Sequence, residues 1–423
     1  MRKIALFALI QLLFALSACG GGGGSGSLGG SGGNGGTGGN GGSGGIASPG
    51  PNVATITVDS GPAGSVGVFN TPFVTVTICA PGSTTNCQTI DHIEVDTGSY
   101  GLRIISSVIN QTLLSALPAE LTPGFSVPIV ECTMFGDGYS WGSMRTADLT
   151  ISSETAAGIP IQVIGDQPAG NVPTACSSTG PSENTVATFG ANGIIGLGPF
   201  AEDCGSACAN GTGFGFYWSC PSSGAACTET QVPLNMQAVN PVTHFMTDNN
   251  GVIVEMPSIA DAGALSSTGA LVFGIGTQGN NGLGSATVLT TDTSFGFITV
   301  SYKNTSYPNS FIDSGSNLYY FNDSALTTCT LSGQSFFCPA AQQSLTAINI
   351  GANNTQSTVT FKVASANTQF NNNPSFEAFA NVAAPNSDAQ GFDFGMPFFY
   401  GRFVYTAVEG KNTSGGMGPY FAY

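Results

Sequence analysis

Two short segments, one in each half of the 423-residue chain, share one design and constrain its fold more than any other feature. Residues 93–99 (Ile-Glu-Val-Asp-Thr-Gly-Ser) and 311–316 (Phe-Ile-Asp-Ser-Gly-Ser) each carry an aspartate behind an apolar run and before a hydroxyl residue, a glycine and a serine. The glycine allows a tight turn that brings backbone amides close to the carboxylate. One copy is typical of an isolated Asx-type turn, whereas two copies predict a paired site.

Asp96 and Asp313 are the candidate catalytic residues of this pair. Two carboxylates held close together cannot both ionise easily, so they share a proton. One then acts as a base on a water molecule while the other acts as an acid toward a carbonyl group. The neighbouring hydroxyls orient the carboxylates or the opposite loop. The residues expected to form the two loops are Thr97, Gly98, Ser99, Ser314, Gly315 and Ser316.

The rest of the chain favours β structure. Runs rich in β-branched residues, several with period-two alternation, are bounded by Gly, Pro, Asn and Ser. Helical periodicity is confined to short pieces around residues 107–117 and 324–328. Because 423 residues are too many for one compact core, we expect a mostly-β protein with two lobes. The clearest β runs are residues 54–58, 73–78, 251–256 and 357–363.

Charged residues make up only 8% of the chain, and acidic residues dominate them. Of the eight Lys and Arg residues, Arg2 and Lys3 lie in the leader, which leaves six against 24 Asp and Glu. Binding to nucleic-acid phosphates needs clusters of basic side chains, so a nucleic-acid partner is not expected. The two histidines and the absence of a nucleophile-elbow pattern also disfavour Ser-His-Asp or Cys-His chemistry. We expect no cofactor and no metal.

The N-terminus has the pattern of an export signal. Arg2 and Lys3 precede an apolar stretch over residues 4–16, which is too short to span a membrane. The stretch closes on Leu-Ser-Ala-Cys, which resembles the bacterial lipoprotein cleavage box and implies lipidation of Cys19 after removal of residues 1–18. The alternative is an ordinary secretory leader with a chance cysteine. Residues 19–50 form a Gly-rich tether, and the expected location is the cell envelope, at the outer membrane or cell surface.

The cysteine count agrees with export. Without Cys19, ten of the eleven cysteines remain, an even number that predicts up to five disulfides in an oxidising compartment. Cys79 with Cys87, and Cys329 with Cys338, are close enough in sequence to close short loops. Pairing within the cluster at residues 204–227 stays open, with a zinc site as the alternative there.

Beyond the two aspartate loops, further segments make the chain resemble the pepsin family of aspartic peptidases over residues 53–423. The segments that carry this resemblance are residues 96–102, 192–198, 271–274, 394–400 and 404–405. The resemblance implies an all-β, bilobal pepsin-like acid protease fold with an active-site cleft between two β lobes. We assign residues 53–278 to the N-terminal lobe and residues 279–423 to the C-terminal lobe.

The resemblance also implies a flap hairpin over the substrate, at residues 134–140. Its candidate substrate-contacting residues are Phe135, Gly136 and Asp137. The family usually has Tyr where Phe135 stands, bonded to a Trp that falls at Arg103 here, so the sequence departs from the family at both positions. Arg103 is expected to stack on Phe135 or pair with Asp137 and to favour acidic substrate groups; the alternative is that it caps a surface loop.

Two aromatic residues after the flap allow two interpretations. Tyr139 and Trp141 either cover the substrate in place of the missing flap tyrosine or belong to the core of the hairpin.

The function predicted from the sequence is that of an exported, lipid-anchored aspartic endopeptidase. Its partners are a peptide or protein substrate and the membrane that holds the lipid anchor, and the chain is expected to be a monomer. The alternative is a pepsin-like envelope protein with weak or no catalysis and a binding or structural role. The altered flap favours the alternative, and the two intact aspartates favour the enzyme.

Overall fold

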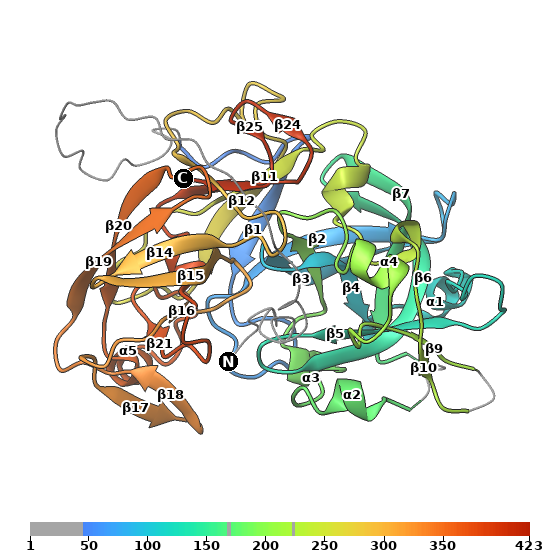
Figure 1. Cartoon of the computed structure of the whole chain (residues 1–423), viewed down its shortest axis with the longest axis horizontal. Helices are drawn as coiled ribbons and strands as arrows, with labels where there is room; N and C mark the ends of the chain where they lie inside the picture. Colours follow the sequence, from blue (N-terminus) through green and yellow to red (C-terminus); the bar gives the residue numbers. More distant parts are fainter. Residues whose placement is uncertain (1–44, 167–170, 222–224) are drawn as a thin grey trace, which may run out of the picture.

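The computed structural model describes residues 45–166, 171–221 and 225–423 (Figure 1). The expected signal peptide (residues 1–18), the lipidation site Cys19 and most of the Gly-rich tether (residues 19–50) lie outside the described residues. Within the described residues, no helix is long and apolar enough to cross a membrane.

Strands make up most of the regular secondary structure, and they are arranged in a 15-stranded sheet, a seven-stranded sheet and two small hairpins. The large sheet contains β1 (Val53–Val58), β2 (Pro72–Cys79), β3 (Cys87–Asp96), β4 (Tyr100–Ile105), β5 (Ile129–Met134), β6 (Tyr139–Ile151), β7 (Glu154–Ile164), β8 (Gly193–Leu197), β9 (Tyr217–Ser219), β10 (Thr228–Glu229), β11 (Gly251–Glu255), β12 (Ser267–Phe273), β13 (Val288–Thr290), β23 (Phe403–Ala407) and β26 (Tyr420–Ala422). The smaller sheet contains β14 (Ile298–Tyr302), β15 (Thr305–Ile312), β16 (Tyr319–Tyr320), β19 (Gln343–Ile350), β20 (Gln356–Val363), β21 (Ala383–Ala384) and β22 (Asp393–Phe394). The hairpins are β17 (Thr328–Leu331) with β18 (Gln334–Phe337), and β24 (Asn412–Thr413) with β25 (Gly416–Met417).

The helices are short and lie in the connections between strands. The α-helices are α1 (Gln111–Ala116), α2 (Thr174–Ser177), α3 (Val186–Phe189), α4 (Ser206–Asn210) and α5 (Ala366–Asn372). The 3-10 turns are η2 (Ser106–Val108), η3 (Leu234–Met236), η4 (Pro241–His244) and η5 (Met396–Phe398).

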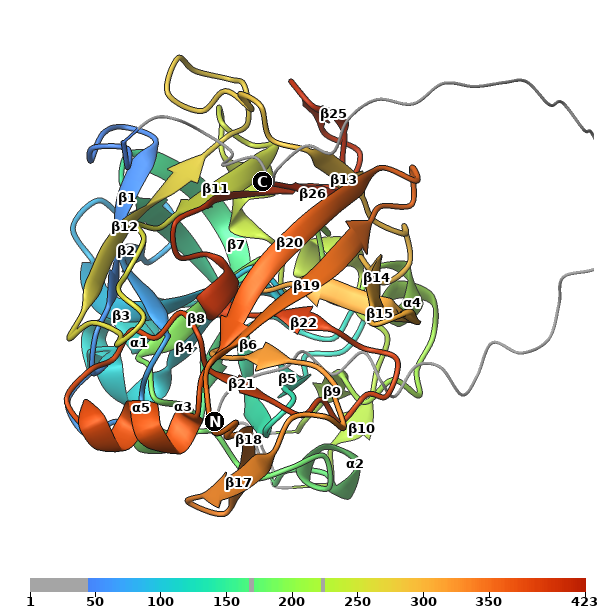
Figure 2. The same cartoon turned by 90° about the vertical axis from the view of Figure 1, so that its left-hand side faces the viewer.

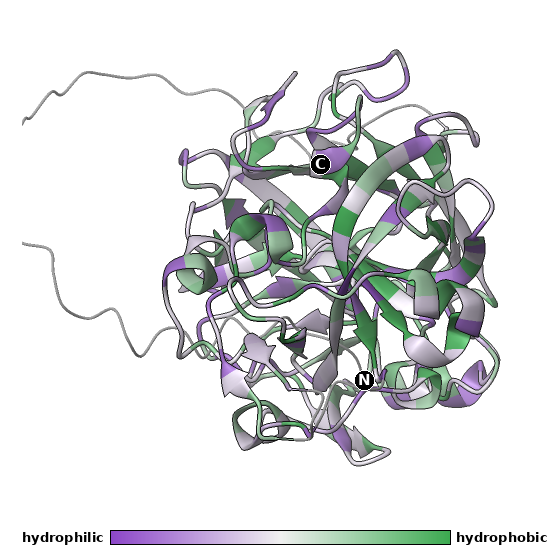
Figure 3. Ribbon diagram, turned by 90° about the vertical axis from the view of Figure 1, so that its right-hand side faces the viewer, coloured by the Kyte–Doolittle hydropathy of each residue, from purple (hydrophilic) through white to green (hydrophobic). Residues whose placement is uncertain are grey.

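The two sheets form two lobes. In Figure 1, β3 to β7 lie in one lobe and β14 to β20 in the other, with β1, β11 and β12 between them. The long pair β19 and β20 faces the viewer in Figure 2, where its antiparallel ladder forms the outer face of the second lobe. Apolar residues concentrate in the strands that cross the middle of the molecule, whereas many outer loops are hydrophilic (Figure 3). The all-β, two-lobed fold expected from the sequence is confirmed.

The large sheet joins the two halves of the sequence. β23 pairs with β11 from Gly251 opposite Ala407 to Glu255 opposite Phe403, and β26 pairs with both β23 and β13. The sheet therefore takes strands from both sides of residue 278. The division into lobes at that residue stays a prediction.

One of the two expected helical pieces is absent. η2 and α1 lie in the piece at residues 107–117, whereas residues 324–328 make a turn and then enter β17. Asp323 closes a single turn there, in which its carboxylate accepts the backbone N–H of Ala325 and its carbonyl oxygen accepts that of Leu326. The disulfide between Cys329 and Cys338 then ties the following hairpin together.

All ten cysteines within the described residues are paired. The two short-loop disulfides predicted from spacing, Cys79–Cys87 and Cys329–Cys338, are confirmed. The cluster at residues 204–227 forms Cys204–Cys208 and Cys220–Cys227, and the fifth bond is Cys132–Cys176. A zinc site needs free thiolates, and the sulfurs of this cluster are bonded to one another. Five disulfides indicate an oxidising, extracytoplasmic environment.

Candidate active site

The two aspartates are placed by the same local arrangement in each lobe. β3 ends at Asp96 and runs parallel to β8, while β15 ends one residue before Asp313 and runs parallel to β22. The strands deliver both side chains to the interior, where Asp96 is 3% exposed and Asp313 1% exposed. The structure therefore brings the two carboxylates into a buried position between the lobes.

Each carboxylate is held by the turn that follows it. The Gly98 N–H donates to Oδ1 of Asp96 at 2.7 Å, and the Ser99 hydroxyl donates to Oδ2 at 2.5 Å. In the second loop the Gly315 N–H donates to Oδ1 of Asp313 at 2.8 Å. The hydroxyl of Ser316 donates to Oδ2 of the same carboxylate at 3.0 Å. These contacts fix the orientation of both side chains.

The two glycines lie directly against the opposite carboxylate. A methyl group added at Gly98 would lie 2.6 Å from Cγ of Asp313, and one added at Gly315 would lie 2.6 Å from Cγ of Asp96. No side chain fits at either position, because real Cβ contacts do not come below 3.0 Å. Glycine is required here for close approach.

Thr97 and Ser314 link the two loops across the lobe interface. The Ser314 N–H donates to Oγ1 of Thr97 at 3.0 Å, and the Thr97 N–H donates to Oγ of Ser314 at 3.2 Å. The Ser314 hydroxyl also donates to the carbonyl oxygen of Val95 at 2.7 Å. This reciprocal bracing is buried, so the loops hold a fixed relative position.

The surroundings of Asp313 favour its protonated form. Burial, followed by the charge of Asp96 and then that of Asp393, raises the pKa of Asp313 well above its usual range. A hydrogen bond with the side chain of Asp96 acts in the same direction. A protonated acid beside a second carboxylate is the chemical state that general acid–base hydrolysis needs.

The hairpin expected as a flap is present between β5 and β6. Its turn is closed by the Phe135 N–H, which donates to the Gly138 carbonyl at 2.7 Å. Phe135 is buried, packs edge-on against Phe189 with ring centroids 5.9 Å apart, and borders the cavity beside the dyad. Gly136 is exposed and Asp137 half-buried at the tip, and neither lines that cavity.

Arg103 lines the cavity beside the dyad, as expected for a residue near the cleft, but its expected partners are wrong. Its side chain is 1% exposed, and it neither pairs with Asp137 nor stacks on Phe135. Instead its guanidinium contacts Glu131 at 2.5 Å and Asp203 at 3.2 Å. A buried guanidinium needs a carboxylate partner, and the two acidic side chains nearest in the fold come from other segments. Arg103 therefore caps no surface loop and has no free charge for a substrate carboxylate.

Two neutral oxygen atoms also accept hydrogen bonds from the guanidinium of Arg103. Nε donates to the Thr133 hydroxyl at 2.7 Å, and Nη1 donates to the carbonyl oxygen of Tyr100 at 2.5 Å. Burial, and next the charge of Glu131, raises the pKa of Asp203 well above its usual range. The closest acidic partner of Arg103 is thus Glu131, and Asp203 is the more distant one.

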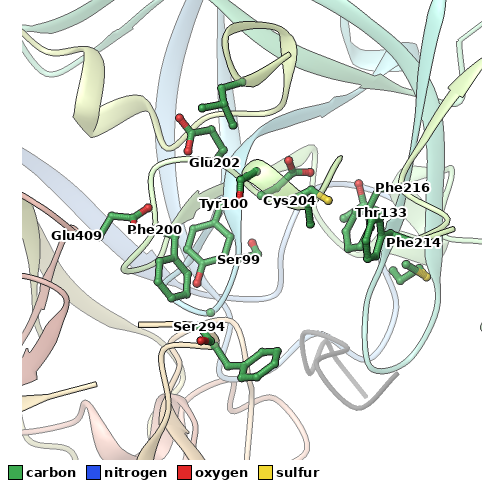
Figure 4. Close-up of a pocket in the computed structure, with 18 of the residues that line it drawn as sticks. Ser99, Tyr100, Thr133, Phe200, Glu202, Cys204, Phe214, Phe216, Ser294 and Glu409 are labelled. Atoms are coloured by element: carbon green, nitrogen blue, oxygen red, sulfur yellow. The ribbon is translucent and has the colours of Figure 1, made fainter. Parts of the chain in front are cut away.

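A cavity of about 700 Å³ opens beside the Asp96 loop (Figure 4). Gly98, Ser99 and Tyr100 line it from one lobe, and residues 293–295 from the other. Glu202 and Glu409 lie at one end, and the rings of Phe214 and Phe216 at the other (Figure 4). The cavity therefore combines an acidic end with an aromatic end directly beside the dyad.

A family model described as "Protein of unknown function (DUF3443)" matches residues 48–423. The chain belongs to the DUF3443 family. No curated protein matches the chain. Among solved structures, the crystal structure of aspartic proteinase from Irpex lacteus is similar to this chain at 15% sequence identity and a TM-score of 0.48. That similarity covers 88% of this chain and 96% of the proteinase chain.

In this DUF3443 protein the two aromatic residues after the flap belong to the core. Tyr139 is 7% exposed and Trp141 3% exposed, and the indole rings of Trp141 and Trp218 lie 6.3 Å apart in an edge arrangement. Both pack in one cluster with the disulfide Cys132–Cys176. Of the two interpretations, the structure supports the core of the hairpin.

Nothing in the sequence indicated several residues opposite the Asp96 loop that line the cavity. Phe200, Glu202, Phe295 and Glu409 line it, yet they come from separate loops with no shared motif. The lining residues that the sequence did indicate include Gly98, Ser99 and Tyr100 of the first aspartate loop and Met134 and Phe135 of the flap. The ring of Tyr100 packs against that of Phe200, with centroids 5.6 Å apart. In the part of the chain that the structure describes, no group of three or more His, Cys, Asp or Glu side chains is arranged to hold a metal ion.

Proposed function

We propose that this DUF3443 protein is an aspartic endopeptidase in which Asp96 and Asp313 activate water to hydrolyse a peptide bond. The observation that carries the proposal is the buried pair, in which each carboxylate is oriented by its own turn. The raised pKa of Asp313, caused first by burial and then by the charge of Asp96, agrees with a pair that shares one proton. Burial strengthens the electrostatic interaction of the pair and excludes competing solvent. The cavity beside the pair provides space for a substrate side chain.

The chemistry follows from the two protonation states. Asp96 removes a proton from water as the oxygen attacks the peptide carbonyl carbon, and Asp313 donates its proton to the carbonyl oxygen. The resulting tetrahedral diol collapses when Asp96 passes its proton to the amide nitrogen. The C–N bond then breaks, and a hydroxyl proton of the diol returns to Asp313. Formation of the diol and its collapse each move two protons, one through each aspartate, and the pair ends in its starting state.

The cavity favours substrates with a basic side chain next to the scissile bond. Its acidic end holds Glu202 and Glu409, and the second of these accepts the N–H of Ala201 at 3.0 Å. Burial, and next the charge of Glu409, raises the pKa of Glu202, so one proton or one cation relieves the repulsion of the two carboxylates. A Lys or Arg side chain supplies that cation and also contacts the aromatic wall.

Replacing Glu202 and Glu409 by Gln is expected to lower kcat/KM for a lysine-containing peptide by roughly tenfold, because about one ion pair of 1–1.5 kcal/mol is lost. The matched substrate carries norleucine in place of lysine, and its kcat/KM is expected to change little. Steady-state kinetics give kcat/KM for both peptides, and the ratio of the two values is compared between the wild type and the variant. An equal loss for both peptides would show that the two glutamates do not select charge.

Export and lipid anchoring at Cys19 are part of the same proposal. The five disulfides support an oxidising location, and the cleavage box at residues 16–19 supports an envelope protein held by a lipid on a Gly-rich tether. A monomeric chain with a peptide or protein substrate fits a cleft closed within one molecule. Mass spectrometry of the mature N-terminus, compared with a Cys19→Ser variant, detects the acyl groups directly.

The proposed activity is tested by incubating the disulfide-bonded protein with an unfolded protein substrate across an acidic pH range. We expect internal cleavage that a statine-type inhibitor blocks. The second candidate is a binding or structural envelope protein, which the replacement of the flap tyrosine and its tryptophan partner by Phe135 and Arg103 favours. No cleavage of any peptide library, together with retention of a specific peptide ligand, would favour the second candidate.

A further inference from the structure

A third carboxyl group is buried next to the dyad. Asp393 is 0% exposed and lies on β22, opposite Phe311 of β15. The next residue on β22, Phe394, lies opposite Ile312, and its carbonyl oxygen accepts the N–H of Asp313 at 3.1 Å. Asp393 therefore lies on the strand next to β15, close to the point where β15 ends and Asp313 follows.

The other lobe has an apolar residue at the matching place. β8 runs parallel to β3 with Gly196 opposite Asp96, so Ile194 stands two residues before that glycine. On β22, Asp393 stands two residues before Gly395, which approaches the carbonyl oxygens of Ser316 and Leu318 in the same supporting role. The two lobes use the same backbone, but one of them has a carboxyl where the other has an isoleucine.

Asp393 has no structural partner that accounts for its burial. Neither carboxyl oxygen makes a hydrogen bond of standard geometry within the described part of the chain. A buried polar group without a partner is costly, and an ionised one far more so, which requires a functional or structural reason. Ser316 is the hydroxyl closest to filling that role, since it lies near enough to lower the pKa of Asp393 while donating to Asp313 at 3.0 Å.

Among the described residues, the charged and titratable groups on the surrounding elements give Asp393 no counter-ion. Asp313 follows β15, Asp96 ends β3, and Tyr319 and Tyr320 lie on β16. The hydroxyl of Tyr320 donates to Asn317, at 2.9 Å, and the guanidinium of Arg402 lies over the ring of Phe398 and donates to the carbonyl oxygen of that residue. The environment of Asp393 therefore holds acids and neutral groups.

We propose that Asp393 is a positioning residue that acts on Asp313 through Ser316, and this proposal rests on the proposed peptidase function of the pair. At acidic pH the neutral form of Asp393 adds no third negative charge next to Asp96 and Asp313. As pH rises, ionisation of either Asp313 or Asp393 makes ionisation of the other less favourable, because two negative charges would then lie in one buried region. Burial first, with the charge of Asp96 adding to it, raises the pKa of Asp393 well above its usual range.

The consequence for catalysis is an active range that extends further toward neutral pH. Asp313 must keep its proton to act as the acid, and negative charge on Asp393 makes loss of that proton harder. Replacing Asp393 by Asn retains the shape and removes the ionisable group. The alkaline limb of the pH profile of kcat/KM is then expected to move to lower pH by roughly one unit, with little change at the acidic plateau. The exposed carboxylate Asp261, replaced by Asn, serves as the control with no expected shift.

A second readout does not depend on catalysis. A carboxyl whose pKa is raised by folding stabilises the protein fully below its unfolded pKa of about 4, and this contribution is lost as pH rises toward the folded pKa. The free energy of unfolding of the wild type should therefore fall with pH above about 4, and the fall should be less steep in Asp393→Asn. The same substitution in an Asp313→Asn background should change the slope by a different amount, because coupled groups are not additive.

The pH profile and the unfolding measurements both test the coupling of Asp393 to Asp313, and the unfolding measurements do so without the peptidase activity. A shifted alkaline limb together with a non-additive change in slope supports the proposal. An unshifted limb, or slopes that add, overturns the coupling of Asp393 to Asp313. If the wild type cleaves no substrate, the peptidase proposal fails, and the unfolding cycle alone still decides whether the two carboxyls are coupled.

Discussion

Replacing Asp96 by Asn is expected to lower kcat/KM for peptide hydrolysis on the order of 10³-fold, because the variant lacks the base that removes a proton from water. The amide keeps the size of the side chain and its contacts with Gly98 and Ser99, so the fold should persist. Replacing Asp313 by Asn should cause a similar loss, because the acid for the carbonyl oxygen is then absent. Initial rates on one fluorogenic peptide measure all three proteins.

The matched control for this prediction is Asp91→Asn. Asp91 lies on the same strand, five residues earlier, but its side chain is 67% exposed. We expect wild-type rates from this control and thermal unfolding curves that match for all the variants. Full activity of Asp96→Asn, with the purified protein free of contaminating peptidase, would reject the assignment of the dyad.

Replacing Arg103 by Met is expected to lower the free energy of unfolding by about 3–5 kcal/mol, since one partner of a buried ion pair is removed. Glu131 is 0% exposed and would lose the guanidinium that contacts it at 2.5 Å, which leaves a buried acidic group without its partner. The carbonyl oxygen of Tyr100 would also lose its donor. Urea unfolding of the disulfide-bonded protein measures the change as a shift in midpoint.

A compensated variant separates the charge from the packing. Arg103→Met combined with Glu131→Gln and Asp203→Asn removes all three ionisable groups and should recover most of the lost stability. Arg103→Lys is expected to remain destabilised, because an ammonium cannot reproduce the contacts to two carboxylates and the Tyr100 carbonyl. If Arg103→Met unfolds at the wild-type urea concentration, the network contributes nothing to folding.

The aspartate loops could be predicted from the sequence because their chemistry is local. The glycine and serine that hold each carboxylate lie two and three residues after it, so one short motif contains the whole turn. The close loops Cys79–Cys87 and Cys329–Cys338 were predictable for the same reason. Contacts of this kind depend on a few neighbouring residues.

The partners of Arg103 could not be predicted in that way. Glu131 and Asp203 are 28 and 100 residues away, and only the folded sheet brings them to the guanidinium. Asp393 gave no signal either, since one acidic residue inside an apolar run has no periodicity to reveal its burial. The short helix α5 was missed because its residues are polar and no apolar face repeats along it.

The peptidase account is tested most directly by a crystal structure of residues 48–423 with a statine-type inhibitor, whose hydroxyl mimics the tetrahedral intermediate. We predict that this hydroxyl lies between the carboxylates of Asp96 and Asp313, at about 2.5–3.2 Å from both. We also predict that an inhibitor side chain occupies the cavity beside Tyr100. Carboxylates that face different sides of the molecule, or an inhibitor bound away from them, would contradict the account.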